Sequence, residues 1–260
     1  MKRKIWGSCS LLILLFFGLV ISGCEKDDTD KPIEDADKET YVPRSNVKYE
    51  YKTTSDGENI GTSTKWIDGS RDSSGIKLYN LHTNLTIAGS SMQLDNELYV
   101  ANGRTYTQVN MPEAWYKMVE ELKKSPDIIV EEAKTTGFPY YNVMENALRE
   151  GSKLTWEVPG TTGQYIRYKR KDGSGPIFEV NQKLVQHPGE VKKIETITVP
   201  AGTFPCAKFV YEISQQQNAS SGTETITVWM AHGIGVVKQE NVTVFNGNTT
   251  SSTTVLNKIK

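Results

Sequence analysis

The chain has 260 residues, of which 37% are hydrophobic, and its 30 basic and 31 acidic side chains give a net charge of −1. Nucleic-acid-binding domains are usually basic, so this balance argues against nucleic acid as a partner. Of the three cysteines, Cys9 and Cys24 lie near the N-terminus and only Cys206 lies in the body of the chain. We therefore expect no internal disulfide, and a chain of this length can bury a core without one.

Residues 1–23 have the organisation of a cleavable signal peptide. The basic run Lys2-Arg3-Lys4 precedes an almost wholly apolar stretch over 5–21, and the small residues Ser22 and Gly23 follow. A membrane anchor is the competing interpretation, but a spanning helix needs about 20 apolar residues and this stretch is shorter and interrupted. We predict that cleavage follows Gly23.

The run Ile21-Ser22-Gly23-Cys24 resembles the lipobox of bacterial lipoproteins. The resemblance implies that Ile21, Ser22 and Gly23 are read by the processing machinery and that Cys24 is lipidated. Each CH₂ of a buried acyl chain adds about 0.8 kcal/mol of membrane affinity, so several chains would hold the protein at the membrane. The alternative is an ordinary secretory signal with an unlipidated Cys24.

Residues 24–45 read as an acidic, flexible tether, because they are charged and have few apolar residues. Lys26-Asp27-Asp28 resembles the surface-export signal of Bacteroidota-type lipoproteins. This resemblance implies a lipid-anchored protein of the outer membrane, displayed on the cell surface; a periplasm-facing protein is the second choice. A tract of like charges can also be a simple solvated linker.

Ordered structure is predicted from residue 46 onward, beginning with a strand. Over 47–52, the apolar residues Val47, Tyr49 and Tyr51 alternate with charged ones, which is the period of a half-buried strand. Short segments of the same kind follow between turn clusters, over 62–67, 76–81, 85–88, 92–94, 97–101 and 105–109. The pattern predicts an antiparallel meander.

The period changes to that of helices in an insert over 112–149. Pro112 suits a first helical turn, and the face formed by Trp115, Met118, Val119 and Leu122 is amphipathic. A second helix is expected around Ile128, Ile129 and Ala133, and a third around Val143, Met144, Ala147 and Leu148. The insert would cover the sheet, because its apolar faces need a surface on which to pack.

Strands return for the remainder of the chain. They are predicted over 153–158, 164–170, 177–185, 191–199, 207–213, 223–230, 236–245 and 253–259. The sequence therefore predicts one mainly β domain over 46–260 with a helical insert, of the α+β class. Its core would be a curved antiparallel sheet, or an open β-barrel or clam, covered by helices.

The C-terminal third carries a distinctive motif over 195–204, 206–208 and 227–238. It resembles the TapB-like family of bacterial envelope lipoproteins, whose function is unknown, and the resemblance is strongest over 150–260. Met230 and His232 depart from the family pattern. The family implies an open β-barrel or clam whose helices plug the sheet.

Read on its own, this motif indicates two turns between strands. Pro200 cannot donate to a strand ladder and Gly202 tolerates a left-handed backbone, while Gly233 and Gly235 mark the second turn. The motif is therefore more typical of turns that shape the fold than of a functional site.

Motifs for catalysis or metal binding are absent from the sequence. It has no Cys-x-x-Cys and no His-Glu-x-x-His, and His82, His187 and His232 lack metal-ligand spacing. A Cys206–His232 pair could serve a hydrolase, but a lone cysteine in an apolar strand is usually a small buried hydrophobe. We predict that the protein is not an enzyme and has no metal or cofactor.

Aromatic residues suggest one candidate site. Trp115, Tyr116, Met118 and Trp156 could line a cleft for an apolar ligand, although such residues more often form a core. We predict a non-enzymatic binding or accessory module for an apolar ligand or a protein partner such as an outer-membrane protein. The alternatives are a structural subunit of an outer-membrane assembly without a small ligand, and a hydrolase that uses Cys206.

Overall fold

The computed structural model describes residues 39–87, 90–111, 113–157 and 160–260, without the side chains of residues 90, 156 and 157. Its strands are β1 Tyr49–Ser55, β2 Glu58–Ser73, β3 Ile76–Ile87, β4 Ser90–Ala101, β5 Arg104–Val109, β6 Ile128–Thr136, β7 Tyr140–Glu145, β8 Lys153–Glu157, β9 Thr161–Arg170, β10 Phe178–Gln186, β11 Gly189–Val199, β12 Gly202–Gln217, β13 Ser220–Ala231, β14 Gly235–Phe245 and β15 Asn248–Ile259. One described helix, α2, spans Glu113–Lys124. It is not long and apolar enough to cross a membrane, and the described residues contain no helix that is.

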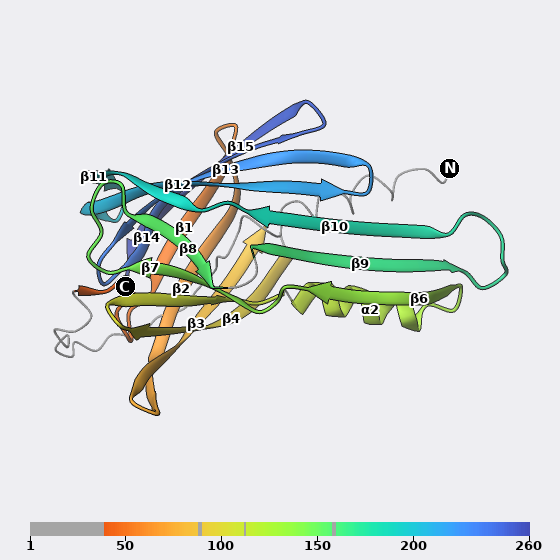
Figure 1. The fold of residues 1–260 in the computed structure, drawn as a ribbon, viewed down its shortest axis with the longest axis horizontal. Helices are drawn as coiled ribbons and strands as arrows, with labels where there is room; N and C mark the ends of the chain where they lie inside the picture. Colours follow the sequence, from red (N-terminus) through yellow and green to blue (C-terminus); the bar gives the residue numbers. More distant parts are fainter. Residues whose placement is uncertain (1–38, 88–89, 112, 158–159) are drawn as a thin grey trace.

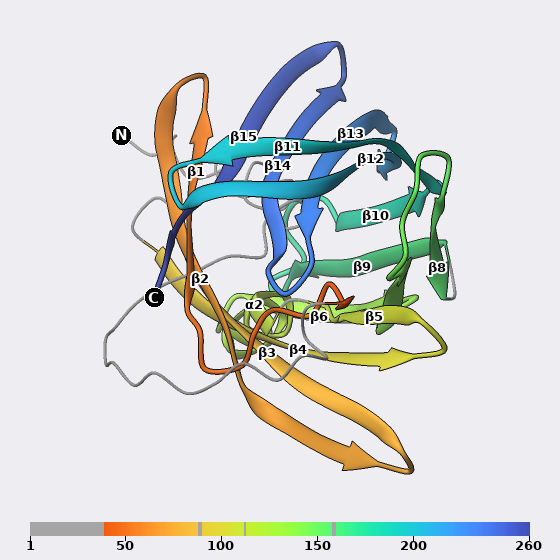
Figure 2. The ribbon, with the colours of Figure 1, turned by 90° about the vertical axis from the view of Figure 1, so that its left-hand side faces the viewer.

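Twelve of the strands form a closed antiparallel barrel, in the order β11-β8-β7-β5-β4-β3-β2-β1-β15-β14-β13-β12. Strand β11 closes the ring because it pairs on both sides. Gly189 lies opposite Leu154 of β8, and Val191 lies opposite Phe209 of β12. Figure 2 shows the strands surrounding a central space. Closure removes the two free edges that an open sheet would expose.

The predicted α+β class, with an open sheet covered by helices, is therefore wrong. A closed barrel leaves no open concave face for a helical insert, and α2 lies outside the barrel (Figure 1). The error has a long-range cause. The predictions treated strand segments over 153–158 and 191–199 separately, whereas Gly189 and Glu190 join β11 to β8 and complete the ring.

Of the three predicted helices in 112–149, only the first is confirmed, as α2. The segment with Ile128 and Ile129 is strand β6, and the segment with Val143 and Met144 is strand β7. The run Ile128-Ile129-Val130 is β-branched, which favours a pleated surface over a helix, and β6 gains a full ladder with β9. The pairing of these segments with strands distant in sequence outweighed the helical spacing of their few apolar residues.

Strands β6, β9 and β10, with α2, form a part of the molecule that we call the extension. It arises because β12 is 16 residues long: residues 202–210 pair with β11, and residues 213–217 pair with β10. Beyond this fork, β10, β9 and β6 run away from the barrel as neighbouring strands, with α2 packed along β6 (Figure 1). The extension therefore shares β12 with the barrel but has its own core.

Helix α2 forms at the position that its amphipathic pattern predicts. Glu113 lies in its first turn and Lys123 and Lys124 in its last, which complements the helix dipole at both ends. Trp115 and Val119 are buried against Ile166 of β9. This apolar contact, rather than the interior of the barrel, satisfies the helix's hydrophobic face.

Residues 39–46, here called the strap, lie against one end of the barrel, which faces the viewer in Figure 2. The amide of Gly233 donates to the carbonyl of Thr40 (2.8 Å), and the amide of Arg44 donates to the carbonyl of Gly233 (3.1 Å). Tyr41 packs with the apolar residues of β7, β8 and β11–β13, whereas Val42 packs with those of β2–β4. The strap thus joins two walls of the barrel, although residues 39–45 fall within the predicted tether.

The two turns predicted from the C-terminal motif are confirmed. β11 and β12 meet at Pro200-Ala201, and β13 and β14 meet across 232–234. Gly202, Gly233 and Gly235 have φ values of 139°, 66° and 78°. These are backbone conformations that glycine adopts without steric cost, so the motif encodes two hairpin corners of the barrel.

Candidate ligand-binding cavity

The residues of the predicted cleft do not gather at one cavity. Trp115 is only 6% exposed and Met118 packs beside it in the core of the extension, whereas Tyr116 is 50% exposed. Trp156 pairs in register with Asn142, and its side chain lies outside the described set. The lipidation and processing residues, Ile21 to Cys24, also lie outside the described residues.

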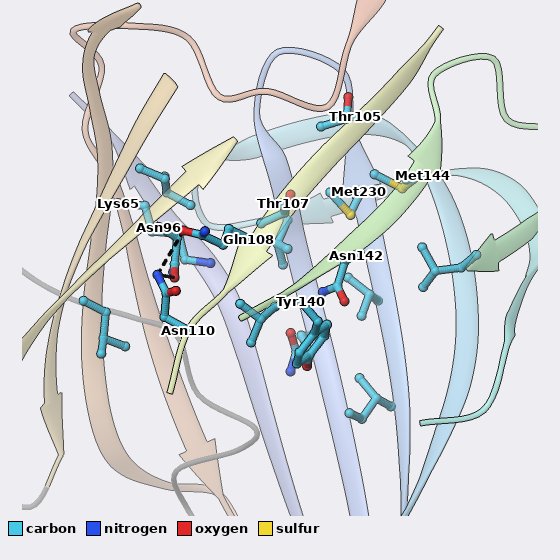
Figure 3. A pocket seen from close by; sticks show the side chains of 18 of the residues that line it. Lys65, Asn96, Thr105, Thr107, Gln108, Asn110, Tyr140, Asn142, Met144 and Met230 are labelled. Carbon is cyan, nitrogen blue, oxygen red and sulfur yellow. Dashed lines mark hydrogen bonds between the residues drawn. The ribbon is translucent and has the colours of Figure 1, made fainter. Parts of the chain in front are cut away.

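A cavity of about 470 Å³ occupies the lumen of the barrel (Figure 3). Its volume falls in the range of about 300–1,000 Å³ that is typical of small-molecule sites. The lining comes from β1–β5, β7, β8, β10 and β12–β15, and also includes Glu113 at the start of α2. In a barrel, alternate residues of every strand point inward, so the cavity is built by residues far apart in sequence.

One wall of the cavity is apolar. Its residues alternate along β12 and β13, where Phe209 lies opposite Val228 and Tyr211 lies opposite Ile226. Met144, Leu154, Ile213, Met230 and Val236 extend this surface. The period-two spacing of these residues places them on one face of the sheet. This wall can accommodate a hydrocarbon group.

Polar side chains form the other wall, on β2, β4 and β5 and just beyond. The Nδ2 atom of Asn110 donates to the carbonyl of Asp95 (3.1 Å) and to Oδ1 of Asn96 (3.3 Å). It also lies 3.1 Å from Oε1 of Gln108. Figure 3 shows Lys65, Asn96 and Asn110 on one side of the lumen, with Met144 and Met230 on the other. The cavity is therefore amphipathic in cross-section.

Two acceptor atoms of the lining have no hydrogen-bond partner among the described residues. They are Oε1 of Gln186, a residue only 8% exposed, and Oδ1 of Asn142. The Nε2 atom of Gln186 donates to the hydroxyl of Tyr140, and burial raises the pKa of Tyr140 to about 12. Buried polar atoms nearly always have a partner, so these oxygens call for a donor from water or from a bound molecule.

Lys65 on β2 is the cation of the lining. It is partly buried, its Nζ lies 5.4 Å from the centre of the Tyr51 ring, and desolvation lowers its pKa to about 8. No carboxylate pairs with it within the part of the chain that the structure describes. A charged group held partly out of water without a counter-ion is costly, which marks Lys65 as a candidate anion-binding group.

A buried carboxylate, Glu224, lies on the inward face of β13 two residues before the apolar wall. It is 4% exposed and accepts hydrogen bonds from Nε2 of Gln215 (3.0 Å) and Nδ2 of Asn241 (2.9 Å). Burial raises its pKa, because neither amide brings a positive charge to offset the lost hydration. Amide donors from the two neighbouring strands satisfy this group, so it belongs to the barrel's framework.

Cys206 has the surroundings of an unreactive thiol. It is buried, and desolvation, followed by the charge of Glu195, raises its pKa to about 12. Its Sγ contacts the carbonyl of Phe204 (3.5 Å), while Nε2 of His232 lies 2.8 Å from the carbonyl of Asn146. Catalytic thiols have lowered pKa values, so this environment gives no support to a Cys206–His232 pair.

The other histidines also have structural partners. His82 lies between Asp68 (2.9 Å) and Asp95 (2.7 Å), and His187 contacts the hydroxyl of Ser214 (2.8 Å). Among the described residues, no cluster of histidine, cysteine and acidic side chains has the arrangement needed to hold a metal ion.

Sequence reasoning missed the residues that make this cavity distinctive, namely Lys65, Asn96, Asn142 and Gln186. A signal was available. Each of these polar residues lies in a strand, and at least one of the residues two positions before or after it is buried. Without the closure of the barrel, however, such residues look like the solvated face of an open sheet.

The comparisons with known proteins agree with the fold. Residues 179–256, less than half of the chain, match a family described as DUF3108-like. That stretch includes the two motif turns; the similarity to the TapB-like family stays a prediction. No curated protein matches the chain.

Two solved structures are similar. A protein from Bacteroides fragilis, described as an inferred exported protein with a YmcC-like fold, has a TM-score of 0.54 at 16% identity, covering 84% of this chain and 97% of that one. An inferred lipoprotein from Parabacteroides distasonis has a TM-score of 0.58 at 18% identity, covering 85% of this chain and 98% of that one. At these identities the likeness shows the fold alone.

Proposed function

We propose that this protein is a lipid-anchored envelope lipoprotein whose barrel binds one small amphiphilic molecule and performs no chemical reaction. The observation that carries the proposal is the closed lumen with its cavity of about 470 Å³. One wall is apolar, the other is polar, and two lining acceptors lack partners. A packed structural core would leave no space of this size.

The proposed location rests on the leader. The lipobox resemblance and the acidic residues after Cys24 support an outer-membrane protein anchored by lipid, displayed on the cell surface or facing the periplasm. The Parabacteroides distasonis neighbour, described as an inferred lipoprotein, is consistent with an anchored chain of this fold. Labelling of cells with a fatty-acid probe tests the anchor, and loss of the label in Cys24→Ala is expected.

Binding in the lumen can be tested with a neutral fluorescent probe, N-phenyl-1-naphthylamine, and the mature chain 24–260 carrying Cys24→Ser. Thr107 lines the cavity (Figure 3), so Thr107→Trp should fill much of the space and abolish the fluorescence increase. Val242→Trp places the same side chain on an exposed position of β14 and should leave binding unchanged. Equal binding by both variants would show that the lumen is not the site.

The alternative, an accessory subunit without a small ligand, stays a prediction. The extension offers the residues on which to test it, because Tyr116, Ile129 and Ile177 are exposed apolar side chains there and nearby. Single exposed apolar residues are common on protein surfaces and carry no argument alone. Loss of a co-purifying protein in Ile129→Glu, with ligand binding intact, would favour this alternative.

A further inference from the structure

The charge distribution of the cavity is the starting point. Two carboxylate side chains belong to its lining, and both are exposed and paired: Asp95 with His82 (2.7 Å) and Glu113 with Lys117 (3.1 Å). Lys65 has no such partner among the described residues. Lys65 is therefore the charged side chain of the lining that has no ion-pair partner among the described residues.

The surroundings of Lys65 suit an anion. Asn96 lies on the same side of the lumen as Lys65 in Figure 3, and its Oδ1 accepts a hydrogen bond from Asn110. The amide nitrogen of Asn96 is left as a second donor, with no hydrogen-bond partner among the described residues. The two unpaired acceptors, on Asn142 and Gln186, belong to β7 and β10, away from Lys65 on β2. An anionic group beside Lys65 would thus lie away from these two unpaired oxygens.

Across the lumen lies the apolar wall of β12 and β13, with Phe209, Ile226 and Val228. A molecule that satisfied both walls would have a charged end and a hydrocarbon chain. Inorganic anions would leave the apolar wall hydrated, and a neutral hydrocarbon would leave Lys65 without a counter-charge. Burial of each CH₂ of a chain is expected to tighten binding about fourfold.

We propose that the cavity takes a single-chain anionic amphiphile, with its headgroup at Lys65 and Asn96 and its acyl chain against Phe209, Ile226 and Val228. This inference rests on the proposed function and adds the chemical class of the ligand. A free fatty acid and a phosphate-bearing single-chain lipid share this chemistry. The lowered pKa of Lys65 is consistent with a desolvated cation that has no counter-ion among the described residues.

The test compares twelve-carbon ligands that differ only in their headgroups. The mature Cys24→Ser chain is freed of co-purified lipid and loaded with N-phenyl-1-naphthylamine at pH 7. Displacement of this probe is then measured with dodecanoate, dodecyl phosphate, dodecanol and dodecyltrimethylammonium in turn. Inorganic phosphate is included as a headgroup alone. We expect at least one of the two anionic ligands to bind tenfold or more tighter than dodecanol, and inorganic phosphate to displace nothing at the same concentration.

Lys65→Gln should abolish this preference and leave the affinity for dodecanol within about twofold. Lys52→Gln changes an exposed lysine on the adjacent strand β1 and should change neither affinity. Lys65→Met serves as a second variant if Lys65→Gln does not fold. Equal affinity for charged and neutral ligands, or a preference that survives loss of Lys65, would overturn the headgroup assignment. Displacement by no amphiphile would overturn the proposed function instead.

Discussion

The barrel and the extension are built from the same kind of antiparallel strands, yet their interiors differ. In the extension, Trp115 and Val119 of α2 fill the space over Ile166. In the barrel lumen, Lys65, Asn142 and Gln186 stand where apolar side chains would close the space. Large aromatic residues occur in both regions, since Phe209 and Tyr211 line the cavity. The comparison therefore teaches that inward polar residues, rather than aromatic ones, mark the hollow region.

Among the tests of this comparison, the largest change in the free energy of unfolding is expected in the extension. Trp115→Ala removes a buried side chain and should lower the free energy of unfolding by about 3–5 kcal/mol, measured by urea unfolding followed by circular dichroism. The neighbouring Tyr116→Ala alters an exposed side chain and should stay within about 0.5 kcal/mol. Similar losses for both would mean that the helix face is not the core described above.

The next effect concerns the lumen and its cation. Because desolvation lowers the pKa of Lys65 to about 8, the free protein loses this charge as the pH rises past that value. If Lys65 binds the headgroup, the affinity for dodecanoate should begin to fall near pH 8, by up to about tenfold for each pH unit. Dodecanol is the control and should bind equally across this range. An identical pH profile for both ligands would contradict the role of Lys65.

A smaller effect is expected in the pH dependence of stability, because one carboxylate in each region has a shifted pKa. Burial raises the pKa of Glu224, so it contributes stability below the unfolded pKa near 4.5 that is lost as the pH rises towards the folded value. In the extension, Lys169 donates a hydrogen bond to the carboxylate of Glu131, and this bond lowers the pKa of Glu131. The positive charge of the nearby Arg167 lowers it further. Glu131 therefore contributes stability at higher pH that is lost as the pH falls.

The two variants Glu224→Gln and Glu131→Gln should consequently change the pH dependence of stability in opposite directions. Relative to the wild type, Glu224→Gln should gain stability as the pH rises above 4.5, whereas Glu131→Gln should lose stability as the pH rises towards 4.5 from below. Thermal unfolding at intervals from about pH 3 to about pH 8 provides the measurement. Slopes of the same sign would show that the two carboxylates do not differ as described.

The smallest effect is expected in the reactivity of the Cys206 thiol, in a filled part of the barrel. With Cys24 replaced by serine, the native protein should show almost no reaction with Ellman's reagent at pH 8, because the thiol is buried and its pKa is about 12. One thiol per chain should react once denaturant is added. Fast labelling of the native protein would show an accessible, reactive thiol and revive the hydrolase alternative.

The sequence allowed most strands, helix α2 and both motif turns to be predicted, because each depends on a local period or on a turn residue. It did not allow the closure to be predicted, since this depends on the pairing of Gly189 and Glu190 with residues that are distant in sequence. The same limit applies to the cavity. Lys65 and Phe209 face one lumen only once twelve strands have closed around it.

The strap also sets the geometry of attachment. Residue 39 is held at one end of the barrel, so only about fifteen residues separate it from Cys24, and they reach at most about 50 Å when fully extended. A lipid on Cys24 would therefore hold the strap end of the barrel within about 50 Å of the bilayer. Asn110 and Glu113 line the cavity near the far end of β5, at the other end of the barrel. The end of the cavity at these two residues is thus not the end at which the lipid would be attached.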